Sequence, residues 1–133
     1  MDYARTTHSK NCLMVHLIFA VKYRKKLLIG YGAEFKQIFY DIAKEKDFEI
    51  VEMEIDKDHI HVLVRYSPTK SVVDIVKLLK QISTYRIWRQ NGNDINLRKH
   101  FWKEQTFWSD GYFACSIGQV SIEAIRKYIQ EQG

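Results

Sequence analysis

The chain has 133 residues, of which 46% are hydrophobic and 28% charged, and its formal net charge is +5. This length and composition suit one domain with its own core, so we expect residues 1–133 to form a single domain and exclude a disordered or low-complexity protein. The modest basic excess is compatible with a polyanion such as nucleic acid but does not require one.

The start of the chain and the two cysteines favour a reducing setting. The polar stretch MDYARTTHSK lacks the apolar core of a signal peptide. The apolar run from Leu13 to Val21 is far shorter than the about 20 residues of a membrane helix. Cys12 and Cys115 lie far apart in apolar runs and suit small buried side chains rather than a disulfide or a metal pair. We therefore expect a cytoplasmic protein without a membrane partner.

The first half of the chain predicts a strand, a helix and a hairpin. Residues 12–23 are β-branched and aromatic and indicate a long buried strand. Apolar residues at helical spacing over 35–43 indicate an amphipathic helix. Segments 48–56 and 59–66 flank the polar turn DKD and indicate two paired strands.

Simple alternation in segment 48–56 predicts one wetter face. It places Ile50 on the same face as Glu52 and Glu54, and Met53 with Ile55 on the opposite one.

The second half predicts a long helix, a strand and a short terminal helix. Ser71, with Asp74 three residues later, resembles a capping box for a helix that runs to about Gln90. The loop NGND follows, then a strand over 112–118, and Ser121 caps a last helix that continues to the C-terminus.

The resulting order, β-α-β-β-α-β with an added helix, is the ferredoxin-like or RRM-like pattern of α+β proteins. It predicts an antiparallel sheet with the first and third strands central and both main helices on one face. The C-terminal helix is the natural cover for the other face.

Two histidines on the strand 59–66 are candidate metal ligands. Alternation places His59 and His61 on one face and the apolar residues between them on the helix side. Imidazoles at i and i+2 stand about 7 Å apart at Cα, so both rings can reach one metal ion. A lone His-x-His pair is short and weakly specific, however, and by itself favours two half-buried structural histidines.

The terminal helix carries a tyrosine and a glutamine on one edge. Tyr128 and Gln132 are at i and i+4, beside a stripe of isoleucines. Alone, this pattern also fits a docking helix. Together with the histidines and a basic cluster, it fits a metal-assisted attack of tyrosine on a phosphodiester, because a phenol with a pKa of about 10 needs a metal-polarised phosphate. Two imidazoles and one amide oxygen can hold a divalent ion and leave positions open.

Other side chains allow two interpretations each. The basic cluster at the end of the first strand is predicted to contact phosphates, or else is a solvated strand exit; it comprises Lys22, Arg24, Lys25 and Lys26. Trp102, Trp108 and Tyr112 suit either base stacking or core packing. His16, on the first strand, is a core histidine or an auxiliary site group.

Four segments resemble the single-tyrosine HUH transposases of the insertion sequence 200/605 type, where HUH denotes His–hydrophobic–His. HLIFAVKYRKKLL is similar to the first strand of that family and its basic exit, and DHIHVLV to its metal strand. FWSDGYFACSIG is similar to its Trp-x-x-Gly-Tyr segment, and IRKYIQEQ to its Tyr-x-x-x-Gln helix. The segments occur in the family's order and cover nearly the whole chain.

The resemblance implies that residues 1–133 form a single HUH transposase domain in which Tyr128 attacks single-stranded DNA, leaving a 5′-phosphotyrosine and a free 3′-hydroxyl. It implies that His59, His61 and Gln132 ligate Mg²⁺ or Mn²⁺. It also implies a homodimer that recognises DNA hairpins near the element ends. Its active sites can be composite, with Tyr128 of one subunit serving the histidines of the other.

Alternatives from other functional classes stay open. A non-catalytic nucleic-acid-binding module of the same fold would explain the charge and the aromatics, and an inactivated transposase would retain the motifs. Replication initiators and relaxases share HUH chemistry, but they are usually larger.

Overall fold

The computed structural model describes residues 13–101, 103–117 and 130. Tyr128 and Gln132 of the expected terminal helix lie outside these residues, as do Cys12 and Trp102. The helices and strands, in chain order, are β1 (Leu13–Ala20), the 3₁₀ turn η2 (Lys22–Arg24), α1 (Leu28–Glu45), β2 (Glu49–Ile55), β3 (His59–Tyr66), α2 (Val72–Asn91), α3 (Ile95–His100) and β4 (Phe113–Ile117).

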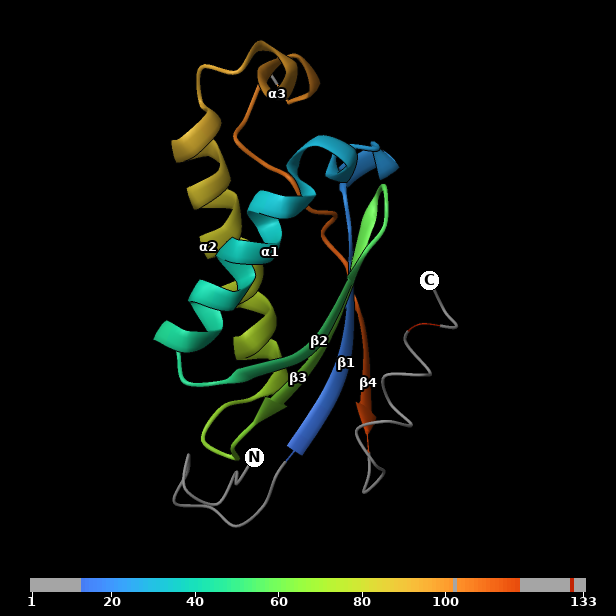
Figure 1. Ribbon diagram of the computed structural model, residues 1–133, viewed down its shortest axis with the longest axis vertical. Coiled ribbons are helices and arrows are strands. Elements are labelled where there is room, and N and C mark those ends of the chain that lie inside the picture. The colour runs from blue at the N-terminus through green and yellow to red at the C-terminus, as the bar shows by residue number, and fades with distance from the viewer. Residues whose placement is uncertain (1–12, 102, 118–129, 131–133) are drawn as a thin grey trace.

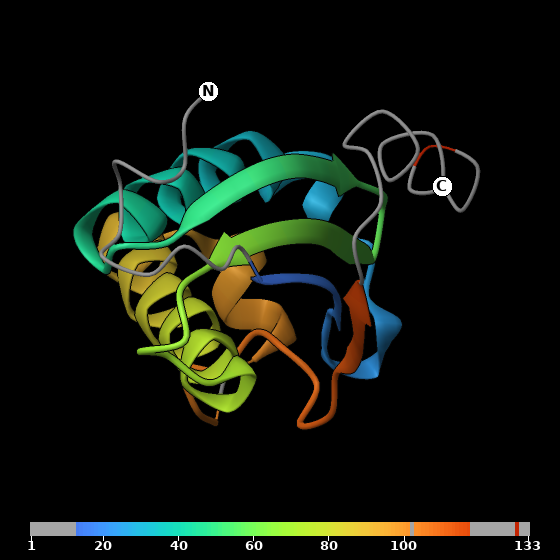
Figure 2. The ribbon, with the colours of Figure 1, turned by 90° about the horizontal axis from the view of Figure 1, so that it is seen from below.

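The four strands form one antiparallel sheet in the order β2-β3-β1-β4. The α+β class and the central position of β1 and β3 are therefore confirmed. Both long helices pack on one face of this sheet (Figures 1 and 2). We call this the helix face and the opposite one the open face. None of the described helices is long and apolar enough to cross a membrane.

The main hydrophobic core lies between the sheet and the two long helices. Ile60, Val62 and Val64 of β3 point into it, as alternation predicted. Other buried members come from β1, α1, α2 and the segment that precedes β4: Val15, Leu17, Phe19, Phe35, Phe39, Ile75, Leu79, Phe107 and Trp108. Each fully buried side chain of this size contributes about 1.5–3 kcal/mol to folding. The core therefore holds β3 in place and turns its alternate side chains to the open face.

A β-bulge changes the predicted pattern of β2. Ile50 pairs with Val64 and Glu52 pairs with Leu63, so Val51 is an extra residue in the strand. Ile50 enters the main core, whereas Val51 packs near Leu63 on the open face. The prediction that Ile50 shares a face with Glu52 was wrong, because a bulge inserts one residue and reverses the alternation beyond it.

The long second helix begins as predicted. The Asp74 N–H donates to Ser71 Oγ at 3.1 Å, and the Ser71 N–H donates to Asp74 Oδ2 at 3.3 Å. This reciprocal pair is a capping box, which satisfies amide groups that the first turn leaves unpaired.

Two predicted boundaries and one short helix are further differences between the prediction and the structure. β1 stops at Ala20, because Tyr23 and Arg24 adopt positive φ angles of 62° and 52° in the turn that follows. α1 begins at Leu28, before the apolar spacing that indicated it. The sequence did not predict α3, which is short and is capped by Asp94 through the Asn96 N–H at 2.9 Å.

Candidate functional site: a histidine cluster on the open face

His59 and His61 lie side by side on the open face of β3. Their ring centroids are 5.0 Å apart and their planes are inclined by 66°. The side chain of His59 is partly exposed, whereas His61 is buried. The structure thus brings together the two histidines that the sequence proposed as ligands.

A third histidine, His16 of β1, contacts His61 directly. His16 Nε2 lies 3.1 Å from His61 Nδ1, which is a hydrogen bond between two buried rings. The rings stack with centroids 5.2 Å apart and an interplanar angle of 20°, and Phe113 of β4 meets His16 edge-on. From the sequence, His16 was either a core histidine or an auxiliary group of the site. In the structure it is buried and lies next to His61.

His59 is held by a carboxylate that the sequence analysis did not single out. Its Nδ1 lies 2.8 Å from Asp58 Oδ1, and Arg24 Nε donates to Asp58 Oδ2 at 3.2 Å. These two hydrogen bonds, with His59 first, lower the pKa of Asp58 below its ordinary value, so the carboxyl is ionised at neutral pH. The sequence offered one indication of this contact: Asp58, in the polar turn, directly precedes His59.

Burial keeps the two inner rings neutral. Desolvation, followed by the nearby charges of His16 and His59, lowers the pKa of His61 to about 4. Desolvation also lowers the pKa of His16. A neutral imidazole retains the lone pair that a metal ligand or a general base needs.

The donor set of the pair fits a divalent cation. Asp58 contacts Nδ1 of His59 and His16 contacts Nδ1 of His61, so Nε2 is the nitrogen at which each ring would meet a ligand. For a neutral His61 this requires that Nδ1 carries the proton. The carboxylate of Asp56 lies 3.8 Å from His59 Nε2 and adds negative charge nearby. Within the described residues, His, Cys, Asp and Glu form no group of three placed to hold a metal. The described residues therefore offer two candidate ligands, His59 and His61, and the expected third, Gln132, lies outside the described part of the chain.

The predicted basic cluster surrounds the 3₁₀ turn after β1. Lys22 Nζ donates to Glu104 Oε1 at 3.3 Å, and this bond raises the pKa of Lys22. Lys25 Nζ lies 3.1 Å from His100 Nδ1, and Lys26 is exposed. Lys22, Arg24 and Lys25 thus connect the turn to Glu104, Asp58 and His100. Their predicted contacts with DNA stay a prediction.

The aromatic residues considered for base stacking separate into two kinds. Trp108 is buried in the main core, where its indole N–H donates to Ser83 Oγ at 3.0 Å. Trp108 is therefore a core residue, as one of the two interpretations predicted. Tyr112 remains exposed, and so does Tyr23, whose side chain is 74% exposed at the tip of the basic turn. Tyr23 was not singled out from the sequence, although it lies inside the basic cluster.

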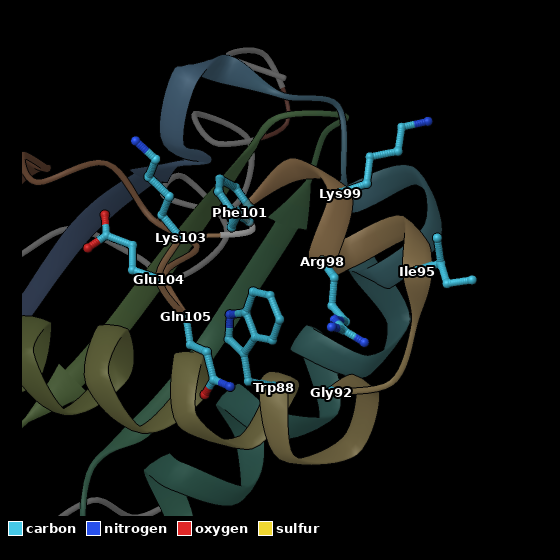
Figure 3. Close-up of a pocket in the computed structure, with 9 residues that line it drawn as sticks. All are labelled: Trp88, Gly92, Ile95, Arg98, Lys99, Phe101, Lys103, Glu104 and Gln105. Atoms are coloured by element: carbon cyan, nitrogen blue, oxygen red, sulfur yellow. The ribbon is translucent and has the colours of Figure 1, made fainter.

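A separate hollow of about 540 Å³ lies where the end of α2 meets α3 (Figure 3). Trp88 and Phe101 line it together with the cationic side chains Arg98, Lys99 and Lys103. Neither His59 nor His61 borders this hollow, so it is distinct from the histidine cluster.

The family described as "Transposase IS200 like" matches residues 9–132. The chain belongs to this family. The ISDra2 transposase TnpA of Deinococcus radiodurans is 33% identical over 121 residues, which cover 90% of this chain and 84% of that protein. The transposase for insertion sequence element IS200 of Salmonella typhimurium is 28% identical over 132 residues, covering 98% of this chain and 84% of that protein.

Solved structures place this IS200-like transposase among proteins of the same fold. A crystal structure of a protein assigned as a transposase from Deinococcus radiodurans R1 has a TM-score of 0.71 at 29% identity and covers 95% of both chains. A REP-associated tyrosine transposase bound to a REP hairpin has a TM-score of 0.61 at 12% identity, covering 88% of this chain and 62% of that one. At the lower identity the likeness concerns the fold alone.

Proposed function

We propose that this member of the IS200-like transposases cuts and rejoins single-stranded DNA at the ends of an insertion element through a 5′-phosphotyrosine intermediate on Tyr128. The histidine cluster carries the proposal: two neighbouring rings on a central strand have their Nδ1 atoms in contact with Asp58 and His16, so Nε2 is the nitrogen at which each ring would meet a ligand. In the proposal, His59, His61 and Gln132 hold Mg²⁺ or Mn²⁺.

The proposed cleavage is a transfer of the phosphoryl group from DNA to tyrosine. The Tyr128 phenol oxygen forms a bond to phosphorus and gives up its proton to water, while the bond from phosphorus to the 3′ oxygen breaks. The 3′ oxygen takes a proton and leaves as a free hydroxyl. Rejoining reverses these steps with a 3′-hydroxyl as the attacking group. A divalent ion at the histidines supplies polarisation of the phosphate and offsets its negative charge.

DNA hairpins at the element ends, bound by a homodimer in the cytoplasm, are the proposed partners. Lys22, Arg24, Lys25 and Lys26 are the proposed phosphate contacts because they form a basic turn beside the histidines. In the composite arrangement, Tyr128 of one subunit serves His59 and His61 of the other. A tyrosine transposase of the same fold was solved with a REP hairpin, which fits hairpin DNA as the proposed partner.

The test is a search for a covalent protein–DNA adduct. Single-stranded oligonucleotides copied from the DNA that flanks the gene are incubated with the full chain and Mg²⁺ or Mn²⁺, then resolved on a denaturing gel. We expect an adduct that needs the metal, disappears with Tyr128→Phe and disappears with His59→Ala. Tyr40→Phe, which alters a tyrosine on the exposed side of α1, is the matched control and should retain the adduct.

Other outcomes contradict the proposal in different ways. Hairpin binding without any adduct, indifferent to divalent metal and to His59→Ala, would indicate a non-catalytic binding module. Metal-dependent binding without cleavage on any flank would indicate an inactivated transposase. An adduct that survives Tyr128→Phe would assign the nucleophile to another residue.

A further inference from the structure

The two histidines of the pair are supported by different kinds of partner. A carboxylate such as Asp58 can only accept a hydrogen bond, so the 2.8 Å contact requires a proton on Nδ1 of His59. In the neutral ring, Nε2 then carries the lone pair. His61 instead meets His16, whose ring nitrogen can donate or accept. The tautomer of His59 is thus dictated by its neighbour, whereas that of His61 depends on how one proton is shared with His16.

Only one of the two ways to share this proton allows His61 to act as a ligand through Nε2. If His16 Nε2 donates, His61 Nδ1 accepts, and a neutral His61 must then carry its proton on Nε2. If His61 Nδ1 donates, His16 Nε2 accepts and Nε2 of His61 keeps its lone pair. The stacked rings and the 3.1 Å contact fix the direction in which that lone pair points.

We propose that His16 is a positioning residue for the metal site: its Nε2 accepts the Nδ1 proton of His61 and so holds His61 as a ligand through Nε2. This inference rests on the proposed function, because it presumes that the histidine pair binds a divalent ion. It extends the site to β1, the strand that pairs with β3 along its whole length. Outer partners of this kind orient metal-bound histidines, and their loss typically weakens metal binding about 10- to 100-fold.

The position of His16 favours a positioning role over a role in core packing. Its side chain is on the open face, outside the apolar cluster beneath the helices, although only 1% of its surface is exposed. A buried polar ring at an apolar position would be costly without a partner. Here the contact with His61 gives the ring a polar partner in the direction of the site.

Binding of Mn²⁺ to the full chain without DNA tests the proposal through affinity rather than activity. His16→Phe preserves the ring and its stacking but removes the acceptor, and we expect it to weaken Mn²⁺ binding about 10- to 100-fold. His16→Gln places an amide oxygen near the position of Nε2 and should recover most of the affinity. His100→Phe, a histidine in α3 that contacts Lys25, is the matched control and should bind Mn²⁺ as the wild type does.

The pattern across variants separates positioning from simple structural support. A folded His16→Phe protein with wild-type Mn²⁺ affinity would overturn the proposal, and so would equal losses in the Phe and Gln variants. Wild-type protein whose Mn²⁺ binding is insensitive to His59→Ala and His61→Ala would overturn the metal site itself. The adduct assay distinguishes that failure from a failure of His16 alone.

A second measurement needs no variant. Nitrogen-15 chemical shifts of the histidine rings in a Mg²⁺-loaded sample report which nitrogen carries the proton. We expect a proton on Nδ1 for both His59 and His61, and on Nδ1 for His16. A proton on Nε2 of His61 in that sample would overturn the proposal even if every His16 variant failed to fold.

Discussion

The two faces of the sheet are built from the same strands but follow different rules. On the helix face, β1 and β3 contribute Leu17, Phe19 and Val62, which are fully buried against apolar neighbours. On the open face, the same strands contribute His16 and His61, which are nearly as buried and are joined to each other by a hydrogen bond. The helix face therefore stabilises the fold through burial, whereas the open face uses that rigidity to hold polar groups in place.

This contrast explains why an unusual site can be tolerated in a small domain. Burying two imidazoles reduces stability unless each is neutral and hydrogen-bonded. Burial of apolar side chains on the helix face stabilises the fold and offsets the cost of burying the imidazoles on the open face. Substitutions on the two faces should therefore change the free energy of unfolding by different amounts and for different reasons.

The largest effect is expected from truncation on the helix face. Phe39→Ala removes a fully buried ring that contacts Phe19 and Trp108, and it should reduce the free energy of unfolding by about 3–5 kcal/mol. The matched change on the open face, Phe113→Ala, alters a ring that is 48% exposed and should have a much smaller effect. Denaturant unfolding of both variants measures the difference, and equal losses would refute the contrast between the faces.

An intermediate effect is expected from pH acting on His61. Its pKa is about 4 in the folded protein and near 6.5 when unfolded, so the unfolded chain binds more protons between these values. The free energy of unfolding of the metal-free protein should therefore fall as pH drops from about 6.5 to about 4, by about 3 kcal/mol from this residue.

Urea unfolding at several pH values measures this dependence. His61→Gln, which cannot titrate, should give a shallower fall over the same window. An unchanged slope in that variant would place the proton uptake elsewhere.

The smallest effect is expected at the rim of the open face. Arg65 Nη1 lies 3.4 Å from Glu49 Oε1, and the Glu49 side chain is 47% exposed. Because solvent and salt screen such a pair, Glu49→Gln should change the free energy of unfolding by less than about 1 kcal/mol. The change should shrink further in 1 M salt, where the screening length is about 3 Å. A salt-independent loss above that limit would show that the rim is as tightly coupled as the core.

Local signals made most of the fold predictable from the sequence. The alternation in His59–Tyr66 and the Ser71 capping box were confirmed because each depends on residues close together in the chain. The bulge at Val51 was missed because its cause is tertiary: the core requires Ile50 on the helix face. α3 was missed because a helix of one or two turns has too few residues to show periodicity.

The candidate site also has parts that local sequence patterns predict and parts that depend on tertiary structure. The proximity of His59 and His61 follows from strand geometry alone. The contact between His16 and His61 depends on the register of β1 against β3, in which His61 pairs with Ile18 and the two rings meet diagonally. No local pattern encodes that register. Asp58 was within reach of local reasoning, since it adjoins His59, but its role required the orientation of the ring.

The sheet order also has a consequence for the sequence of assembly. β3 pairs with β1 and β2, all within the first half of the chain, whereas β4 returns from near the other end to pair with β1. Pairings between distant segments form late, because the loop between them must first be closed. A growing chain thus completes the strands that carry the histidines before β4, and before Tyr128 is added. The two histidines proposed to hold the metal are thus synthesised well before Tyr128, the residue proposed to attack the DNA.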